Sequence, residues 1–229
     1  MALWRLTLLR SKNFIPELKS HLLARVQNIP SAATAPTYNQ SERMQIHIRK
    51  NRIYVHQVMR VNYTTYDMRR NQDSVSPRSH PDIMVLAPDE PDGSAAKHPY
   101  KYGRIYGIYH AVVEYSPPGS RSRKQHDIQF LWVRWFARYA PRNGHGGFRR
   151  KRHTRIGFLP VDAPGAFGFL DPSLVLRGVH MIPCFNGPRI DYFVGSSFLR
   201  SLVEVEADGC KWEYYYVNRL VDAFLFPWY

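Results

Sequence analysis

The residues best suited to chemistry in this sequence are basic. The densest basic segment, 142–155, contains arginine, lysine and two histidines but no acidic residue, and its glycines give it flexibility. Mobile guanidinium groups of this kind can follow a phosphate backbone, where each neutralised phosphate releases counterions. A second basic loop, 121–124, is expected to lie near it if the intervening strands pair. The predicted nucleic-acid contacts are Arg121, Arg123, Lys124, Arg142, Arg149, Arg150, Lys151, Arg152 and Arg155. The alternatives are a solvated loop or a nuclear-import signal.

Catalytic and metal-binding patterns are not found in the sequence. The histidines lack the His-x-x-x-His and His-Glu-x-x-His spacings, and Cys184 and Cys210 have no Cys-x-x-Cys neighbour. We therefore predict no metal site, no cofactor and no catalytic residue. Two-metal nuclease chemistry would require converging carboxylates, and it stays open as a minor alternative. The carboxylates it would draw on are Asp82, Asp127, Asp162, Asp171, Glu204 and Asp222.

The composition of the whole chain also points to a polyanionic partner. The formal net charge is +14 and the pI is about 10.0, which favours association with nucleic acid or chromatin. A solubilising surface or an acidic partner protein would explain the same charge. No apolar run is long enough to span a bilayer, so we predict no membrane contact. We predict a nuclear location, with a mitochondrial one as the alternative because Glu17 is the only acid through Arg25.

These basic segments must be positioned by a fold that is largely β. Helical spacing of apolar residues predicts an amphipathic helix over 15–27, which a linker over 31–37 separates from a β-rich module. The predicted division is 1–40 for helix and linker and 41–229 for the module, with a barrel core over about 82–218. Short strands with glycine and proline between them favour a small, curled β-barrel.

Alternation and β-branched residues predict the individual strands. We expect a β-hairpin over 44–55 that turns at Lys50-Asn51, a strand over 61–66 that extends the sheet, and an irregular loop over 67–81. Gly103 and Gly107 are expected to mark a bulge or a close backbone approach. The remaining expected strands are 82–86, 100–115, 128–137, 155–158, 179–182 and 212–217, with a capped helical turn over 171–176.

Aromatic residues in the predicted strands allow two interpretations. Trp132 and Trp135, with Tyr102, Tyr106 and Tyr109, could form a cage or a base-stacking platform. Three residues apart on a strand, the two tryptophans point to opposite faces, so core packing is the favoured interpretation. Arg134 lies inside this apolar strand. We expect it to snorkel or to pair with an acid such as Asp127 or Glu114.

Five phrases occur in order along the sequence: VNYTTYDMRR (61–70), FLWVRWF (130–136), GAFGFLDP (165–172), RGVHMIP (177–183) and YYYVN (214–218). Together they resemble a basidiomycete family associated with Kyakuja-Dileera-Zisupton transposons. The resemblance implies a genomic neighbourhood beside a transposase and supplies no catalytic residues. A shorter pattern, 102–105 followed by 132–136, is similar to the strand pair of bromo-adjacent homology domains, which are chromatin-reading β-barrels.

The sequence therefore predicts a non-catalytic, basic module that helps a transposase or a chromatin partner engage DNA. One alternative is a module of the bromo-adjacent type that binds a protein or histone tail. Another is a decayed transposon fragment without a selected function.

Overall fold

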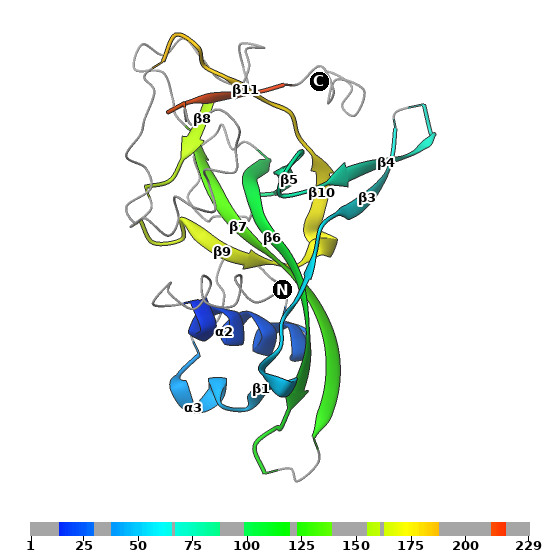
Figure 1. The fold of residues 1–229 in the computed structure, drawn as a ribbon, viewed down its shortest axis with the longest axis vertical. Helices are drawn as coiled ribbons and strands as arrows, with labels where there is room; N and C mark the ends of the chain where they lie inside the picture. The colour runs from blue at the N-terminus through cyan, green and yellow to red at the C-terminus, as the bar shows by residue number, and fades with distance from the viewer. Residues whose placement is uncertain are drawn as a thin grey trace.

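Two long antiparallel strands, β6 (Tyr100–Tyr115) and β7 (Lys124–Arg138), organise the protein (Figure 1). The computed structural model describes residues 14–29, 38–65, 67–87, 99–119, 123–138, 155–160, 163–187 and 212–218. β6 and β7 pair from Tyr115 opposite Lys124 to Gly103 opposite Trp135. Their sequences are rich in β-branched and aromatic residues, which suit a pleated and buried surface. Both strands were predicted from the sequence.

The glycines of β6 explain part of the curvature of this strand pair. The register shifts between Ile105 and Gly107, which confirms the predicted bulge. At Gly103, an added Cβ would lie 2.4 Å from a methyl carbon of Val133, so side chains of β7 occupy the space beside this glycine.

The other strands extend this pair into a strongly curled sheet. Its order is β10-β5-β6-β7-β8-β12-β11, and β9 pairs with the middle of β7. The bounds are β5 Asp82–Leu86, β8 Arg155–Phe158, β9 Phe167–Leu170, β10 Val175–Gly178, β11 Met181–Pro183 and β12 Tyr215–Val217. The protein is mainly β with a short N-terminal helix, and the sheet curls into a half-barrel. The predicted fold class is confirmed.

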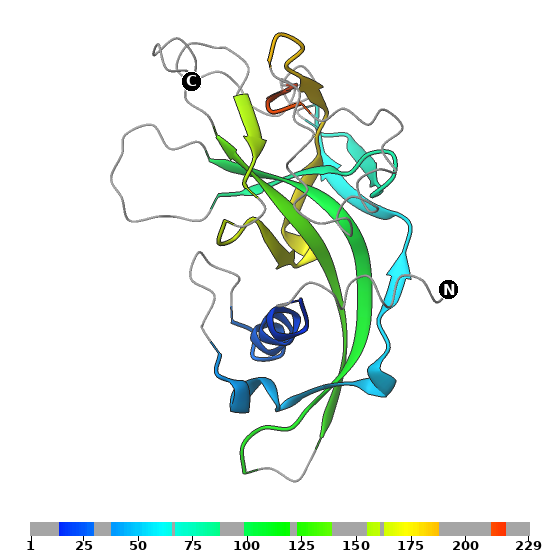
Figure 2. The same cartoon turned by 60° about the vertical axis from the view of Figure 1, so that its left-hand side comes forward.

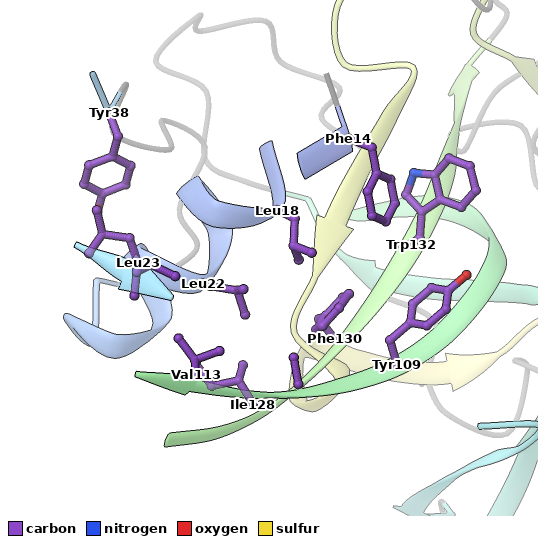
Figure 3. Packing of buried hydrophobic residues seen from close by; sticks show 12 residues of the cluster. Phe14, Leu18, Leu22, Leu23, Tyr38, Tyr109, Val113, Ile128, Phe130 and Trp132 are labelled. Carbon is purple, nitrogen blue, oxygen red and sulfur yellow. The ribbon is translucent and has the colours of Figure 1, made fainter. Parts of the chain in front are cut away.

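The helix α2 (Phe14–Val26) fills the hollow of the curled sheet, as Figure 2 shows. Its buried face carries Phe14, Leu18, Leu22 and Leu23, which recur at helical spacing. Figure 3 shows these side chains directed at the aromatic and aliphatic residues of β6 and β7. Phe14 meets Trp132 edge to face, with ring centroids 5.5 Å apart. The predicted helix over 15–27 is confirmed. Within the described residues, no helix is long and apolar enough to cross a membrane.

The predicted hairpin over 44–55 is wrong. Short strands β1 (Ile46–Ile48) and β2 (Tyr54–His56) both pair with β6, and neither pairs with the other. Between them, the 3-10 turn η1 (Arg49–Asn51) bulges outward, with φ of 55° at Lys50 and 50° at Asn51. Because β6 offers one long free edge and Ile46 is fully buried against it, the chain continues along that edge after the bulge.

The predictions for the next segment are also wrong. Strand β3 (Met59–Thr64) does not extend the main sheet but pairs with β4 (Arg70–Val75), which occupies the predicted loop. These strands form a separate two-stranded ribbon that projects from one side of the half-barrel (Figure 1). β4 is almost entirely polar, and its one buried apolar side chain is Val75. A period-two apolar pattern is therefore missing from β4.

Between β9 and β10 the chain makes the predicted capped turn. Asp171 precedes the 3-10 turn η3 (Pro172–Leu174), and its Oδ1 accepts a hydrogen bond from the Ser173 backbone N–H at 2.9 Å. A second cap precedes the short helix α3 (Gln40–Arg43). There, Asn39 and Glu42 each accept a hydrogen bond from the backbone N–H of the other.

Candidate nucleic-acid interface

The described part of the predicted basic site is divided between the two ends of β7. Arg123 and Lys124 are exposed at its start. Arg155 lies on β8, which pairs with the end of β7 near Arg138. Arg123 and Lys124 therefore lie at the opposite end of β7 from Arg155, while the rest of segment 142–155, which was expected near loop 121–124, lies outside the described residues. The predicted residues Arg121, Arg142, Arg149, Arg150, Lys151 and Arg152 lie outside the described residues.

Arg155 is not a freely exposed cation. Its guanidinium carbon lies 3.7 Å from the centroid of the Tyr214 ring, and its Nε is buried without a hydrogen-bond partner in the described structure. This stacking arrangement helps hold β8 against the segment that leads into β12. Arg155 therefore has a packing role, whereas Arg123 and Lys124 keep the exposure that phosphate contact requires.

Several of the described carboxylates are committed to arginine partners within the protein. Asp82 accepts two hydrogen bonds from Arg104, at 2.7 Å from Nε and 2.9 Å from Nη2, and both side chains are buried. Asp73 lies 3.2 Å from Arg177 Nε, and Asp171 lies 3.0 Å from Arg25. Each of these carboxylates thus neutralises one arginine within the protein, and the net charge of +14 resides on the other residues.

Arg134 does not have the partner that the sequence suggested. It is 1% exposed, so it does not snorkel, and Glu114 lies instead 3.6 Å from Arg123. Asp127 is exposed and sits seven residues away along β7. Arg134 donates to the Leu159 carbonyl at 3.3 Å and lies 4.3 Å from the Phe158 ring centroid. The prediction of an Asp127 or Glu114 partner is wrong.

The aromatic side chains proposed for a cage are part of the core. Trp132 and Trp135 are 4% and 8% exposed and belong to different hydrophobic clusters, as expected for opposite faces of β7. Tyr102 and Tyr109 are buried too, and Tyr106 packs against Trp132. Core packing is confirmed for this set.

The described carboxylates do not converge on a common point. Asp82 and Asp171 have structural partners, and Asp127 is exposed, while Asp162, Glu204 and Asp222 lie outside the described residues. Among the residues that the structure describes, no group of three or more histidine, cysteine or carboxylate side chains is arranged to hold a metal ion. Cys184 is buried, and its Sγ donates to the Tyr216 hydroxyl at 3.5 Å.

Exposed basic residues gather along the edge of β6 and the start of β7, where sequence reasoning found only some of them. We call this surface the basic edge, and its members are Arg49, Lys50, Arg52, Arg123 and Lys124. Arg49 Nη1 donates to Gln125 Oε1 at 3.1 Å, which joins η1 to the start of β7. This surface also contains one acidic partner, Glu114, whose Oε2 lies 3.6 Å from Arg123 Nη1. The structure therefore brings the start of β7 together with η1.

The sequence contained a signal for the residues of the basic edge that were not predicted as site residues. No acidic residue occurs between Glu42 and Asp67, and the basic residues of η1 fall in that interval. Figure 2 shows this part of the chain running along one side of the molecule, from η1 past β2 to the β3–β4 ribbon. The run of basic residues was visible in the sequence. Its position beside the start of β7 was not, because it depends on the pairing of β1 and β7 with opposite edges of β6.

Comparisons with protein-family models, with curated proteins and with solved structures returned no match for this chain. The relationships to the Kyakuja-Dileera-Zisupton-associated family and to bromo-adjacent homology domains therefore remain resemblances read from the sequence.

Proposed function

We propose that the protein binds double-stranded DNA as a non-catalytic module, with the basic edge lying against phosphates. The observation that carries this proposal is the contact between Arg49 and Gln125, which joins exposed Arg49, Lys50 and Arg52 around η1 to exposed Arg123 and Lys124 at the start of β7. Asp82 and Asp73, which lie elsewhere in the fold, are paired with Arg104 and Arg177. Exposed, mobile cations on a rigid sheet attract the phosphate backbone without sequence preference.

Two further parts of the proposal follow from the sequence. We place this module in the nucleus, and the resemblance to a transposon-associated family supports a transposase or a chromatin protein as its partner. The basic segment 142–155 would add phosphate contacts to those of the basic edge. The rival function is a histone-tail reader, and its predicted aromatic residues are committed to the core.

The experiment compares two variants that each remove four positive charges. In the edge variant, Arg49, Lys50, Arg52 and Lys124 are changed to glutamine. In the loop variant, Arg149, Arg150, Lys151 and Arg152 are changed to glutamine. Binding to a random duplex is followed by fluorescence anisotropy at several salt concentrations, and circular dichroism checks that each variant is folded.

The edge variant should bind more weakly, with the slope of log K against log salt reduced by about 3 to 4. A similar reduction in the loop variant would add segment 142–155 to the interface. Unchanged affinity in the edge variant would refute the assignment of the basic edge. Binding of histone-tail peptides, with no binding of DNA, would favour the rival function.

A further inference from the structure

The β3–β4 ribbon exposes one whole face to solvent. Side chains alternate along the paired strands, and cross-strand partners include Asn62 opposite Gln72 and Thr64 opposite Arg70. Every residue on this outer face is exposed and polar, and none is acidic. The face consists of Arg60, Asn62, Thr64, Arg70, Gln72 and Ser74.

The opposite face of the ribbon is firmly attached to the half-barrel. Val61 and Val75 are buried in the hydrophobic cluster beneath it. Arg177 on β10 lies 3.2 Å from Asp73 and donates to the Tyr63 hydroxyl at 3.1 Å. Burial also raises the pKa of the Tyr63 hydroxyl. The ribbon that carries the outer face is thus ordered before binding, so binding through this face costs less conformational entropy.

The side chains of the outer face have the hydrogen-bonding chemistry that reads base edges. Gln72 Nε2 donates to Asn62 Oδ1 at 2.7 Å, which orients both amides and leaves a donor and an acceptor free toward solvent. An amide that offers one donor and one acceptor matches the N7 and N6 positions of adenine in the major groove. Arginines such as Arg60 and Arg70 match the O6 and N7 acceptors of guanine.

The shape of the ribbon suits a groove better than a small ligand. The hollow on it is open and shallow, with a volume of about 640 Å³ and polar lining residues. Small-molecule sites are usually more enclosed and more apolar. Six residue pairs span roughly 20 Å, and a two-stranded ribbon fits a major groove that is about 12 Å wide. The major groove of A-form RNA is too narrow to admit it.

We infer that the β3–β4 ribbon enters the major groove of B-form DNA and reads base edges through Asn62 and Gln72, flanked by Arg60 and Arg70. This inference rests on the proposed DNA binding and adds sequence preference to it. The basic edge supplies affinity through phosphates, while the ribbon supplies discrimination among bases.

The test begins with selection of preferred sequences from a duplex library with a randomised centre, using the full chain. The selected duplex and a scrambled duplex of equal composition are then compared by anisotropy. The ribbon variant, Asn62→Ala with Gln72→Ala, removes two amides without changing charge. The control variant, Gln40→Ala with Gln129→Ala, removes two exposed amides elsewhere. A further duplex carries 7-deazapurines, which lack the N7 acceptor of the major groove.

The wild type and the control variant should prefer the selected duplex by about tenfold or more. The ribbon variant should lose this preference to within about twofold, while keeping its affinity for scrambled DNA. The 7-deazapurine duplex should behave like scrambled DNA with the wild-type protein, a readout that needs no variant. Salt-dependent binding without any selected preference, or a preference insensitive to 7-deazapurines, would overturn this inference and leave the proposed function standing. The absence of all DNA binding would overturn both.

Discussion

Replacing Asp82 by asparagine should destabilise the protein strongly, because Asp82 balances a buried guanidinium. Asp82 and Arg104 are joined by two charge-assisted hydrogen bonds, and their side chains are 8% and 10% exposed. Arg104 also lies directly opposite Arg134 in the β6–β7 ladder, and Arg134 is itself buried. Without the aspartate charge, Arg104 would lose both charge-assisted hydrogen bonds to Asp82 while the buried Arg134 stays opposite it in the ladder.

The expected cost is about 3 kcal/mol, at the lower end of the range for breaking a buried ion pair. Asparagine keeps the volume and one acceptor oxygen of aspartate, so the loss is mainly electrostatic. A protein of this size has an unfolding free energy of roughly 5–15 kcal/mol, so the change removes a large part of it. The melting temperature should fall by roughly 6–12 °C.

The assay is chemical denaturation followed by tryptophan fluorescence, since Trp132 and Trp135 are buried in the native state. Asp127→Asn is the matched control, because Asp127 is an exposed aspartate on β7 of the same sheet. It should change the unfolding free energy by less than about 0.5 kcal/mol. The double variant Asp82→Asn with Arg104→Met should be more stable than Asp82→Asn alone. Equal effects of Asp82→Asn and Asp127→Asn would refute the argument from buried charge.

Three further predictions concern stability. Burial lowers the pKa of His21 from 6.5 to about 4, with a contribution from the nearby Arg25 charge. Since the folded state resists protonation, stability should be full above pH 6.5 and fall by up to about 3 kcal/mol as the pH drops to 4. Denaturation at several pH values tests this, and a slope as steep in His21→Leu would contradict it. Arg134→Met should leave stability unchanged or raise it, because a buried cation without a carboxylate partner in the described structure is costly. A loss above about 1 kcal/mol in denaturant would count against that reasoning. Gly103→Ala should cost about 1–3 kcal/mol, because its methyl would lie 2.4 Å from a methyl carbon on β7. In a thermal melt, Gly178→Ala should be nearly neutral, since its nearest neighbour would lie 3.5 Å away, and equal losses in both variants would refute the close approach.

The parts of the fold with strong local patterns could be predicted from the sequence. Helix α2 shows the spacing of an amphipathic helix, and the segments that form β6 and β7 are dense in β-branched and aromatic residues. Asp171 before Pro172 marks a capped turn. In each case the residues that determine the structure are neighbours in the chain.

Strand pairing that depends on distant contacts could not be predicted in the same way. Lys50 and Asn51 have the positive φ angles of a tight turn, yet β1 and β2 both follow β6 because that strand is long enough for both. The polar strand β4 is held by its pairing with β3 and by Val75, and neither leaves an alternating apolar pattern.

The candidate site, too, could be predicted from the sequence only in part. The acid-free interval before Asp67 was visible in the sequence, but only strand pairing brings Arg49 beside Gln125 and the start of β7. The Arg134 environment was also beyond sequence reasoning, because Phe158 and Leu159 reach it from another strand region.

The most direct test of DNA binding is a salt titration of the wild-type protein with a random duplex, followed by fluorescence anisotropy. If the basic edge contacts four or five phosphates, the slope of log K against log salt should be about −4. A slope near zero, or no binding at low salt, would contradict the account and make the net charge of +14 a property of the free surface.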